Sequence, residues 1–319
     1  MTGLEQRQRN SLVKWLAWPE RFEFGTVELV VMRLLFGWVL FSFILTAPPR
    51  FPGLPYPNGL AHLMDLGFLR DAHTVSMLSI TAQVCLVLGV LGVCEPLTLG
   101  WLLFVIVASK SYNQSQGNLG HAGQLVTLCL LAQWLASLRA LAADTTGLRG
   151  LLWAGPVSWR RQAWWMIQTL AAGYTASALT KMIVTHGDWP MRGSNFLLQI
   201  YKAQTEMEVS RMLVPSPFAT VITDFIASHR WFGTFMLIPT WLLEFGAFAA
   251  LFNRRLSLIM GLALIGFHRM TQMLMGISFA EHQYILWIFF VNPAYWLCVS
   301  IAWAKTRLRG NGPGIPSAT

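Results

Sequence analysis

The stretch Val27–Thr46, which reads VELVVMRLLFGWVLFSFILT, decides the fold class of this chain. Its only charged residues are Glu28 and Arg33, and nearly all the others are apolar. An α-helix needs about twenty such residues to cross the roughly 30 Å hydrocarbon core of a bilayer. The run lacks the small-residue cleavage pattern of a signal peptide, so we expect an uncleaved first membrane span.

The whole chain has the composition of this stretch. Hydrophobic residues make up 55% of the 319 residues and charged residues only 12%, against about 25% charged in a typical soluble domain. This composition excludes an ordinary soluble enzyme, a disordered protein and a disulfide-stapled secreted domain. The four cysteines form no CxxC pair and are interpreted as small apolar core residues, with a Cys85–Cys94 redox pair as the alternative.

The apolar runs predict an all-α, polytopic transmembrane bundle of about eight spans, with a range of seven to nine. The predicted spans are Val27–Thr46, Thr74–Val93, Pro96–Ser109, His121–Leu138, Ala163–Val184, Trp231–Phe252, Leu256–Phe279 and Tyr284–Ala304. The third is too short to cross the hydrocarbon, so we expect it to extend to Tyr112 or to be re-entrant. Residues 1–26, 27–304 and 305–319 then form an N-terminal segment, the membrane domain and a tail.

Basic residues predict the orientation of this bundle. With eight spans, thirteen Lys and Arg residues fall on the side of the two termini and seven on the other. Cytoplasmic loops carry the excess of Lys and Arg, so we expect both termini in the cytoplasm of a multi-pass protein of a bacterial-type plasma membrane. The net charge of +9 is assigned to this topology, and no nucleic-acid partner is expected because the basic residues form no stripe.

Two segments on the exoplasmic side are expected to be interfacial helices. Ser216 and Pro217 have the residue types of a helix N-cap and first turn. From Phe218 onward, apolar residues follow at i+3, i+4, i+7 and i+8, which makes one apolar face. The apolar residues within 196–201 indicate a second such helix. Both are expected to lie on the membrane surface or to cap the bundle.

Five charged residues fall inside the predicted spans, where charge is costly and needs a partner or a function. Glu28 and Arg33 are interpreted as structural. Glu244 and Arg269 lie at similar depths in neighbouring spans, so we predict an ion pair between them, with binding of an anionic or carbonyl group as the alternative. Lys181 ends a polar face near the outer end of its span. It is either a desolvated amine base or a lysine that snorkels to the interface.

Histidines supply the remaining polar candidates. His268 shares one helix face with Thr271 and Gln272, at i, i+3 and i+4. It is either a functional residue or a hydrogen-bonded core residue. His121, His186 and His282 occur near outer span ends without the spacing of a metal motif, so no metal site is predicted.

Four short motifs occur in a shared order between about Val27 and Ala304. They are Ser111–Gln114, Ala178–Lys181 with Asp188–Gly193, Pro215–Phe218, and Phe267–Phe279. In order and spacing they resemble the membrane domain of the vitamin-K-dependent gamma-carboxylase, which defines the HTTM superfamily. Ser115 stands where that family has a His tied to carboxylation, so the resemblance implies carboxylation only if His121 substitutes for it. We expect no counterpart, after the last predicted span, of the large exoplasmic domain that binds protein substrates in the carboxylase.

The resemblance implies a quinone site that faces the exoplasmic side, with a reduced, vitamin K-like quinone as cofactor. It implies that Lys181 is the catalytic base and that His268 is a second catalytic residue, which lines the site. The expected substrate-binding residues are Arg269, Gln272, Glu244, Trp189, Asn113 and His121.

Three functions remain open on the sequence. The first is a membrane enzyme that uses a quinol or another lipid-soluble substrate. The second is the role of short superfamily members that mature a secreted peptide toxin together with a small partner protein. The third is a non-enzymatic scaffold that binds lipid or peptide. The expected partners are accordingly membrane lipid and either a small partner protein or a secreted peptide.

Overall fold

A computed structural model describes residues 22–46, 60–115, 123–143, 152–212, 214 and 217–308. This described part is helical and contains no strand. Its long helices are α2 (Thr26–Thr46), α4 (Ala72–Leu91), α5 (Glu95–Ser115), α6 (Gln124–Ala143), α8 (Pro156–Val184), α9 (Gly193–Arg211), α10 (Pro217–Ser228), α11 (Arg230–Phe245), α12 (Arg254–Met275) and α14 (Pro293–Leu308). The short ones are α3 (Leu60–Leu63), η1 (Gly67–Arg70), η2 (Trp189–Met191), η3 (Gly246–Leu251), α13 (Ala280–Leu286) and η4 (Trp287–Val291).

Six helical segments in the described ranges are long and apolar enough to cross a membrane. They are Thr26–Thr46, Ala72–Leu91, Gln124–Ala142, Trp231–Leu251, Arg254–Met275 and Ala280–Arg307. The all-α class and a multi-pass membrane protein therefore agree with the structure. The two further predicted spans correspond to α5 and α8, which are long helices but do not belong to this set. The count of eight spans stays a prediction.

Helix α5 is longer than the sequence pattern indicated. The apolar run predicted Pro96–Ser109, whereas the helix covers the 21 residues Glu95–Ser115. Its polar last turns stay helical because one face of them is covered: Tyr112 and Ser115 are both buried. The helix therefore extends to Tyr112 and beyond, while its crossing of the membrane stays a prediction.

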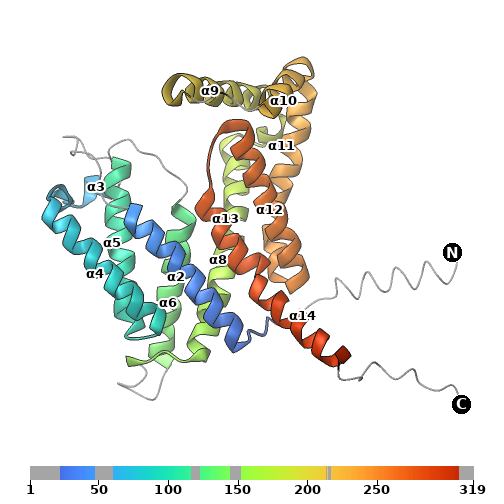
Figure 1. The fold of residues 1–319 in the computed structure, drawn as a ribbon. Helices are drawn as coiled ribbons and strands as arrows, with labels where there is room; N and C mark the ends of the chain where they lie inside the picture. Colours follow the sequence, from blue (N-terminus) through green and yellow to red (C-terminus); the bar gives the residue numbers. More distant parts are fainter. Residues whose placement is uncertain are drawn as a thin grey trace, which may run out of the picture.

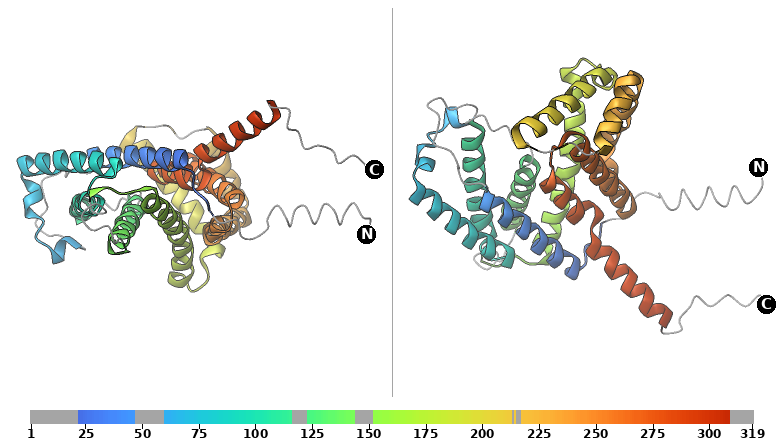
Figure 2. Two further views of the ribbon diagram at one scale, coloured as in Figure 1. Left: turned by 90° about the horizontal axis from the view of Figure 1, so that it is seen from below. Right: turned by 45° about the horizontal axis from the view of Figure 1, so that its top comes forward.

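The two ends of the helix bundle differ in the helices that lie there. Helices α9 and α10 lie across one end, next to the ends of α8, α11 and α12 (Figure 1). Helix α10 begins at Pro217, as predicted. At the opposite end α2 begins and α14 runs out of the bundle, which the views in Figure 2 also show. The short loop between α4 and α5 pairs there with the segment before α8, through a β-bridge between Val93 and Trp153.

Small residues allow the helices to approach closely, as is common in membrane bundles. A Cβ atom added to Gly261 of α12 would lie 2.8 Å from the Phe290 Cβ of η4. A Cβ on Gly193, at the start of α9, would lie 2.4 Å from the backbone nitrogen of Thr234 in α11. These two contacts fix α12 against η4 and α9 against α11, and the second one helps to position the site described next.

Candidate functional site

Helix α8 supplies the face on which the site is built. Tyr174, Ala178 and Lys181 occur at i, i+4 and i+7, so they share one side of the helix. Helix α11 packs antiparallel against α8, and two hydrogen bonds join the C-terminal half of α11 to this part of α8. Trp241 Nε1 donates to the Ala178 carbonyl at 3.1 Å, and Thr175 Oγ1 donates to the Phe245 carbonyl at 3.1 Å.

Lys181 forms an ion pair with Glu244 of α11. The Glu244 carboxylate is buried and the Lys181 side chain is 28% exposed. The Lys181 Nζ also lies 4.9 Å from the centroid of the Trp189 ring, in a cation–π contact. One carboxylate and one indole ring therefore hold the ammonium group at the end of α8.

This pairing corrects the prediction of a Glu244–Arg269 ion pair. Arg269 is exposed, and its Nη1 lies 3.5 Å from Gln272 Oε1 on its own helix. The prediction used only depth along each helix, whereas each step along a helix also rotates the side chain by about 100°. His268 is buried and the next residue, Arg269, is exposed, so the Arg269 side chain is not turned toward the buried Glu244 carboxylate.

A cavity of about 610 Å³ adjoins Lys181. Its walls come from α8, α11 and α12, and residues of η2 and of the first turns of α9 complete its lining. The lining is Thr180, Lys181, Val184, Thr185, Trp189, Arg192, Asn195, Phe196, Gln199, Met236, Leu237, Thr240, Phe267, Met270, Thr271, Leu274 and Met275. Most of these side chains are apolar, so the Lys181 ammonium is one of few charged groups at the cavity.

His268 lies behind the cavity wall and is buried. Its Nε2 is 2.6 Å from the hydroxyl of Tyr174. The imidazole also packs against two other rings, with centroid distances of 5.0 Å to Phe279 and 5.5 Å to His282. His268 therefore does not line the cavity, although the preceding residue, Phe267, does.

The structure brings together about half of the predicted site. Lys181 and Trp189 line the cavity, Glu244 pairs with Lys181, and His268 lies close by. Arg269, Gln272 and Asn113 do not line it. His121 lies outside the described residues. Among the described residues, no group of three or more His, Cys, Asp or Glu side chains is placed to hold a metal ion.

Sequence reasoning did not assign Tyr174 or Arg192 to the site. Tyr174 could have been found, because it lies seven residues before Lys181 and so on the same helix face. Arg192 and the cavity residues of α9 follow Lys181 in a polar stretch without a clear periodicity, and only the folded arrangement places them at the cavity.

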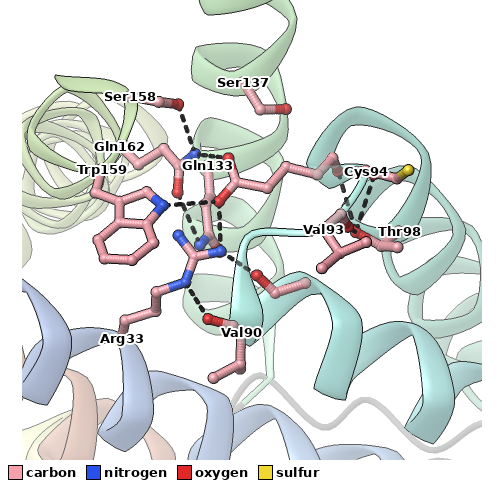
Figure 3. A network of polar contacts seen from close by, with 12 residues as sticks. Arg33, Val90, Val93, Cys94, Thr98, Gln133, Ser137, Ser158, Trp159 and Gln162 are labelled. Carbon is pink, nitrogen blue, oxygen red and sulfur yellow. Dashed lines mark hydrogen bonds and ion pairs between the residues drawn. The ribbon is translucent and has the colours of Figure 1, made fainter. Parts of the chain in front are cut away.

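A second buried polar cluster lies at the other end of α8 (Figure 3). Arg33 of α2 forms an ion pair with Glu95, the first residue of α5. The same carboxylate accepts hydrogen bonds from Trp159 Nε1 at 3.1 Å and from Gln162 Nε2 at 2.5 Å. Arg33 also donates to the carbonyls of Gly89 and Val90 at the end of α4. This cluster joins four helices, which supports the structural role predicted for Arg33.

Glu28 has a comparable structural position. Its carboxylate lies 2.7 Å from the Arg254 guanidinium and accepts a hydrogen bond from Asn292 Nδ2 at 2.5 Å. The Arg254 guanidinium also packs on three aromatic rings, those of Phe22, Phe24 and Tyr295. Glu28 therefore connects α2 with the start of α12 and with the break before α14.

Comparison with known proteins adds no assignment to this geometry. No protein-family model, no curated protein and no solved structure matches the chain. A lysine next to a buried carboxylate and a mostly apolar cavity can exchange a proton with a ligand that is otherwise hydrophobic. It can also stabilise a charge on that ligand.

Proposed function

We propose that this protein is a membrane enzyme for a quinol or another lipid-soluble hydroxyl compound, with Lys181 as the base. The observation that carries the proposal is the Lys181–Glu244 pair at the edge of the apolar cavity. We also propose that the chain belongs to the HTTM superfamily. Lys181 and Trp189 belong to the motif that resembles this superfamily, and they meet at this cavity.

The cavity suits a flat ring with an apolar tail. Ligand sites commonly have volumes of about 300–1,000 Å³ and mostly apolar walls with a few polar groups, and the cavity has about 610 Å³. Phe196 and Phe267 offer surfaces for a ring. The Thr240 and Thr271 hydroxyls donate to carbonyls of their own helices and can accept hydrogen bonds from hydroxyl groups on the ring. A reduced quinone, when bound, would supply an acidic hydroxyl and reducing electrons.

The proton chemistry belongs to Lys181 and Glu244. The Lys181 ammonium gives a proton to the Glu244 carboxylate, and the resulting amine accepts a proton from the bound hydroxyl. The ammonium group so restored then stabilises the negative charge left on the ligand oxygen. The Trp189 ring covers one side of the ammonium and limits its contact with water.

The proposed topology has eight spans, with α5 and α8 as the two additional ones. Both termini would then be cytoplasmic and the cavity would face the exoplasmic side. Helices α5 and α8, with 21 and 29 residues, are long enough for about 30 Å of hydrocarbon. Helices α9 and α10 would lie at the exoplasmic surface, at the end of the bundle opposite to the start of α2 (Figure 1).

Turnover of a quinol by the purified protein in lipid nanodiscs tests the proposal. We expect Lys181→Ala to lower kcat at least 100-fold, because general base catalysis typically contributes about 10²–10⁴. The matched control is Lys202→Ala, an exposed lysine of α9, which should stay within about twofold of the wild type. If Lys181→Ala turns over the quinol as the wild type does, Lys181 is not the base. If Lys181, His268 and Arg269 can each become apolar without loss of function, the protein is a scaffold.

A further inference from the structure

The first turns of helix α9 present a mostly polar side to the apolar cavity. Arg192, directly before the helix, is followed by Asn195 and Gln199 at i+3 and i+7, so the three share one side, and all of them line the cavity. Phe196 is the one apolar residue that α9 adds to this lining. Leu198 lies outside the lining and is 63% exposed. A helix that only closed an apolar cavity would turn its apolar residues inward, so this arrangement indicates that the cavity receives a polar group here.

The cavity also carries an excess of positive charge. Lys181 and Arg192 are the basic residues of its lining, which contains no Asp or Glu among the described residues. The buried Glu244 carboxylate offsets the charge of Lys181. The Arg192 side chain forms no ion pair with any residue that the structure describes. A negatively charged group would therefore complement the end of the cavity at which Arg192 lies.

The backbone around Arg192 is held firmly in place. Its N–H donates to the Trp189 carbonyl at 3.2 Å, and its own carbonyl accepts a hydrogen bond from the Asn195 N–H at 3.0 Å. The next residue, Gly193, packs so closely on the Thr234 nitrogen that it fixes this end of α9 against α11. The Arg192 side chain itself is exposed, so it remains charged and accessible while its starting point is fixed.

The remaining walls of the cavity suit an apolar chain. Met236 and Leu237 of α11 and Met270, Leu274 and Met275 of α12 contribute apolar side chains to the lining. Methionine is unbranched and adapts to irregular shapes. A free anion would leave these walls uncovered, and a neutral lipid would leave the positive charge at the other end without a partner. A molecule with an anionic head and an apolar tail satisfies both ends.

We propose that the cavity binds a single-chain anionic amphiphile whose carboxylate or phosphate group contacts Arg192, Asn195 and Gln199. The guanidinium presents parallel N–H donors that match two oxygens of such a group, and the two side-chain amides add further N–H donors. This inference rests on the proposed function and narrows its substrate class: the lipid-soluble hydroxyl compound also carries an acidic group. Its hydroxyl faces Lys181 while the acidic group stays at Arg192.

Carbon-13 NMR of carboxyl-labelled dodecanoate tests the proposal on the full chain in lipid nanodiscs, with empty nanodiscs as the control for partition into lipid. We expect a bound carboxylate signal that unlabelled dodecanoate displaces at least about tenfold more effectively than dodecanol or acetate. Arg192→Gln should lower the affinity for dodecanoate about tenfold, and Arg192→Lys, which keeps the charge, should lower it less. The matched control Arg70→Gln, an exposed arginine of η1, should leave the affinity unchanged.

Two results would overturn the proposal. Equal affinity for dodecanoate in Arg192→Gln and in the wild type would show that Arg192 does not bind the acidic group. Displacement by dodecanol or by acetate as effective as that by dodecanoate would indicate a neutral lipid or a free anion as the occupant.

The quinol assay keeps this inference apart from the proposed function. Dodecanoate binding that depends on Arg192, in a protein that does not turn over a quinol, supports the anionic amphiphile and refutes the quinol. Quinol turnover that depends on Lys181, in a protein whose dodecanoate binding does not depend on Arg192, overturns this inference and leaves Lys181 as the base.

Discussion

The ion pair between Arg33 and Glu95 allows a quantitative prediction for the variant Glu95→Gln. The Glu95 carboxylate is 2% exposed and accepts hydrogen bonds from Trp159 and Gln162 in addition to its contact with Arg33. Glutamine keeps the shape of the side chain but replaces one acceptor oxygen with a donor group. It leaves the Arg33 guanidinium, itself 7% exposed, as a buried charge without a counter-ion, although its hydrogen bonds to the Gly89 and Val90 carbonyls remain.

Removing one partner of a buried ion pair costs about 3–5 kcal/mol. We therefore expect Glu95→Gln to lower the free energy of unfolding by that amount, which is about two to three and a half powers of ten in the equilibrium constant. Unfolding by sodium dodecyl sulfate in mixed micelles, followed by circular dichroism, measures this change. The control Glu208→Gln changes an exposed carboxylate of α9 and should alter stability by at most about 0.5 kcal/mol.

A double variant separates the ion pair from the shape of the side chain. Arg33→Met combined with Glu95→Gln removes both charges, and a buried pair replaced without an unpaired charge is often close to neutral. The double variant should therefore lose at least about 2 kcal/mol less than the sum of the two single variants. A cost of Glu95→Gln below about 1 kcal/mol, or two single losses that simply add, would show that Arg33 and Glu95 do not stabilise the protein as a buried ion pair.

Three further predictions concern a helix cap and two close contacts. Hydrogen bonds from the Thr74 amide and hydroxyl hold the pKa of Asp71 below its ordinary value. Its cap on α4 is therefore complete above about pH 4 and is lost as the pH falls through the lowered value. The protection of the Thr74 amide against hydrogen exchange, relative to an unstructured amide at the same pH, should then fall in the wild type, and Asp71→Asn should remove this pH dependence. Gly261→Ala places a Cβ 2.8 Å from a side-chain atom of η4 and should cost about 1–3 kcal/mol in the same unfolding assay. Gly193→Ala forces α9 away from the Thr234 nitrogen, 2.4 Å from the new Cβ, and should raise the KM for the quinol; an unchanged KM would show that this end of α9 does not shape the cavity.

The fold class and one part of the site could be predicted from the sequence. Runs such as Val27–Thr46 contain enough apolar residues to predict helices directly, and the scarcity of charge singled out Lys181 and Glu244. Their partnership could not be predicted in the same way, because a count of residues gives depth in the membrane but not the direction in which a side chain points. That direction explains why Glu244 contacts Lys181 and not Arg269.

Other features depend on contacts between distant segments. Glu95 stands between two predicted spans and has the sequence context of a loop residue. It is buried because the segment around it pairs with Trp153 and because α2 brings Arg33 to it. Helix α9 was indicated by only a few apolar residues, since it is polar for most of its length. Its place beside the cavity comes from the close contact between Gly193 and α11.

The two polar clusters on α8 have a consequence for the lipid around the protein. Gln162 belongs to the cluster of Arg33 and Glu95, and Lys181 belongs to the pair with Glu244. Nineteen residues separate these two positions, which is about 28 Å of helix at 1.5 Å per residue. In the proposed orientation, the length of helix between the two clusters is matched to the thickness of the bilayer. Lipids with much shorter or longer chains would then expose or bury one end of it, so lipid length would tune the surroundings of Lys181.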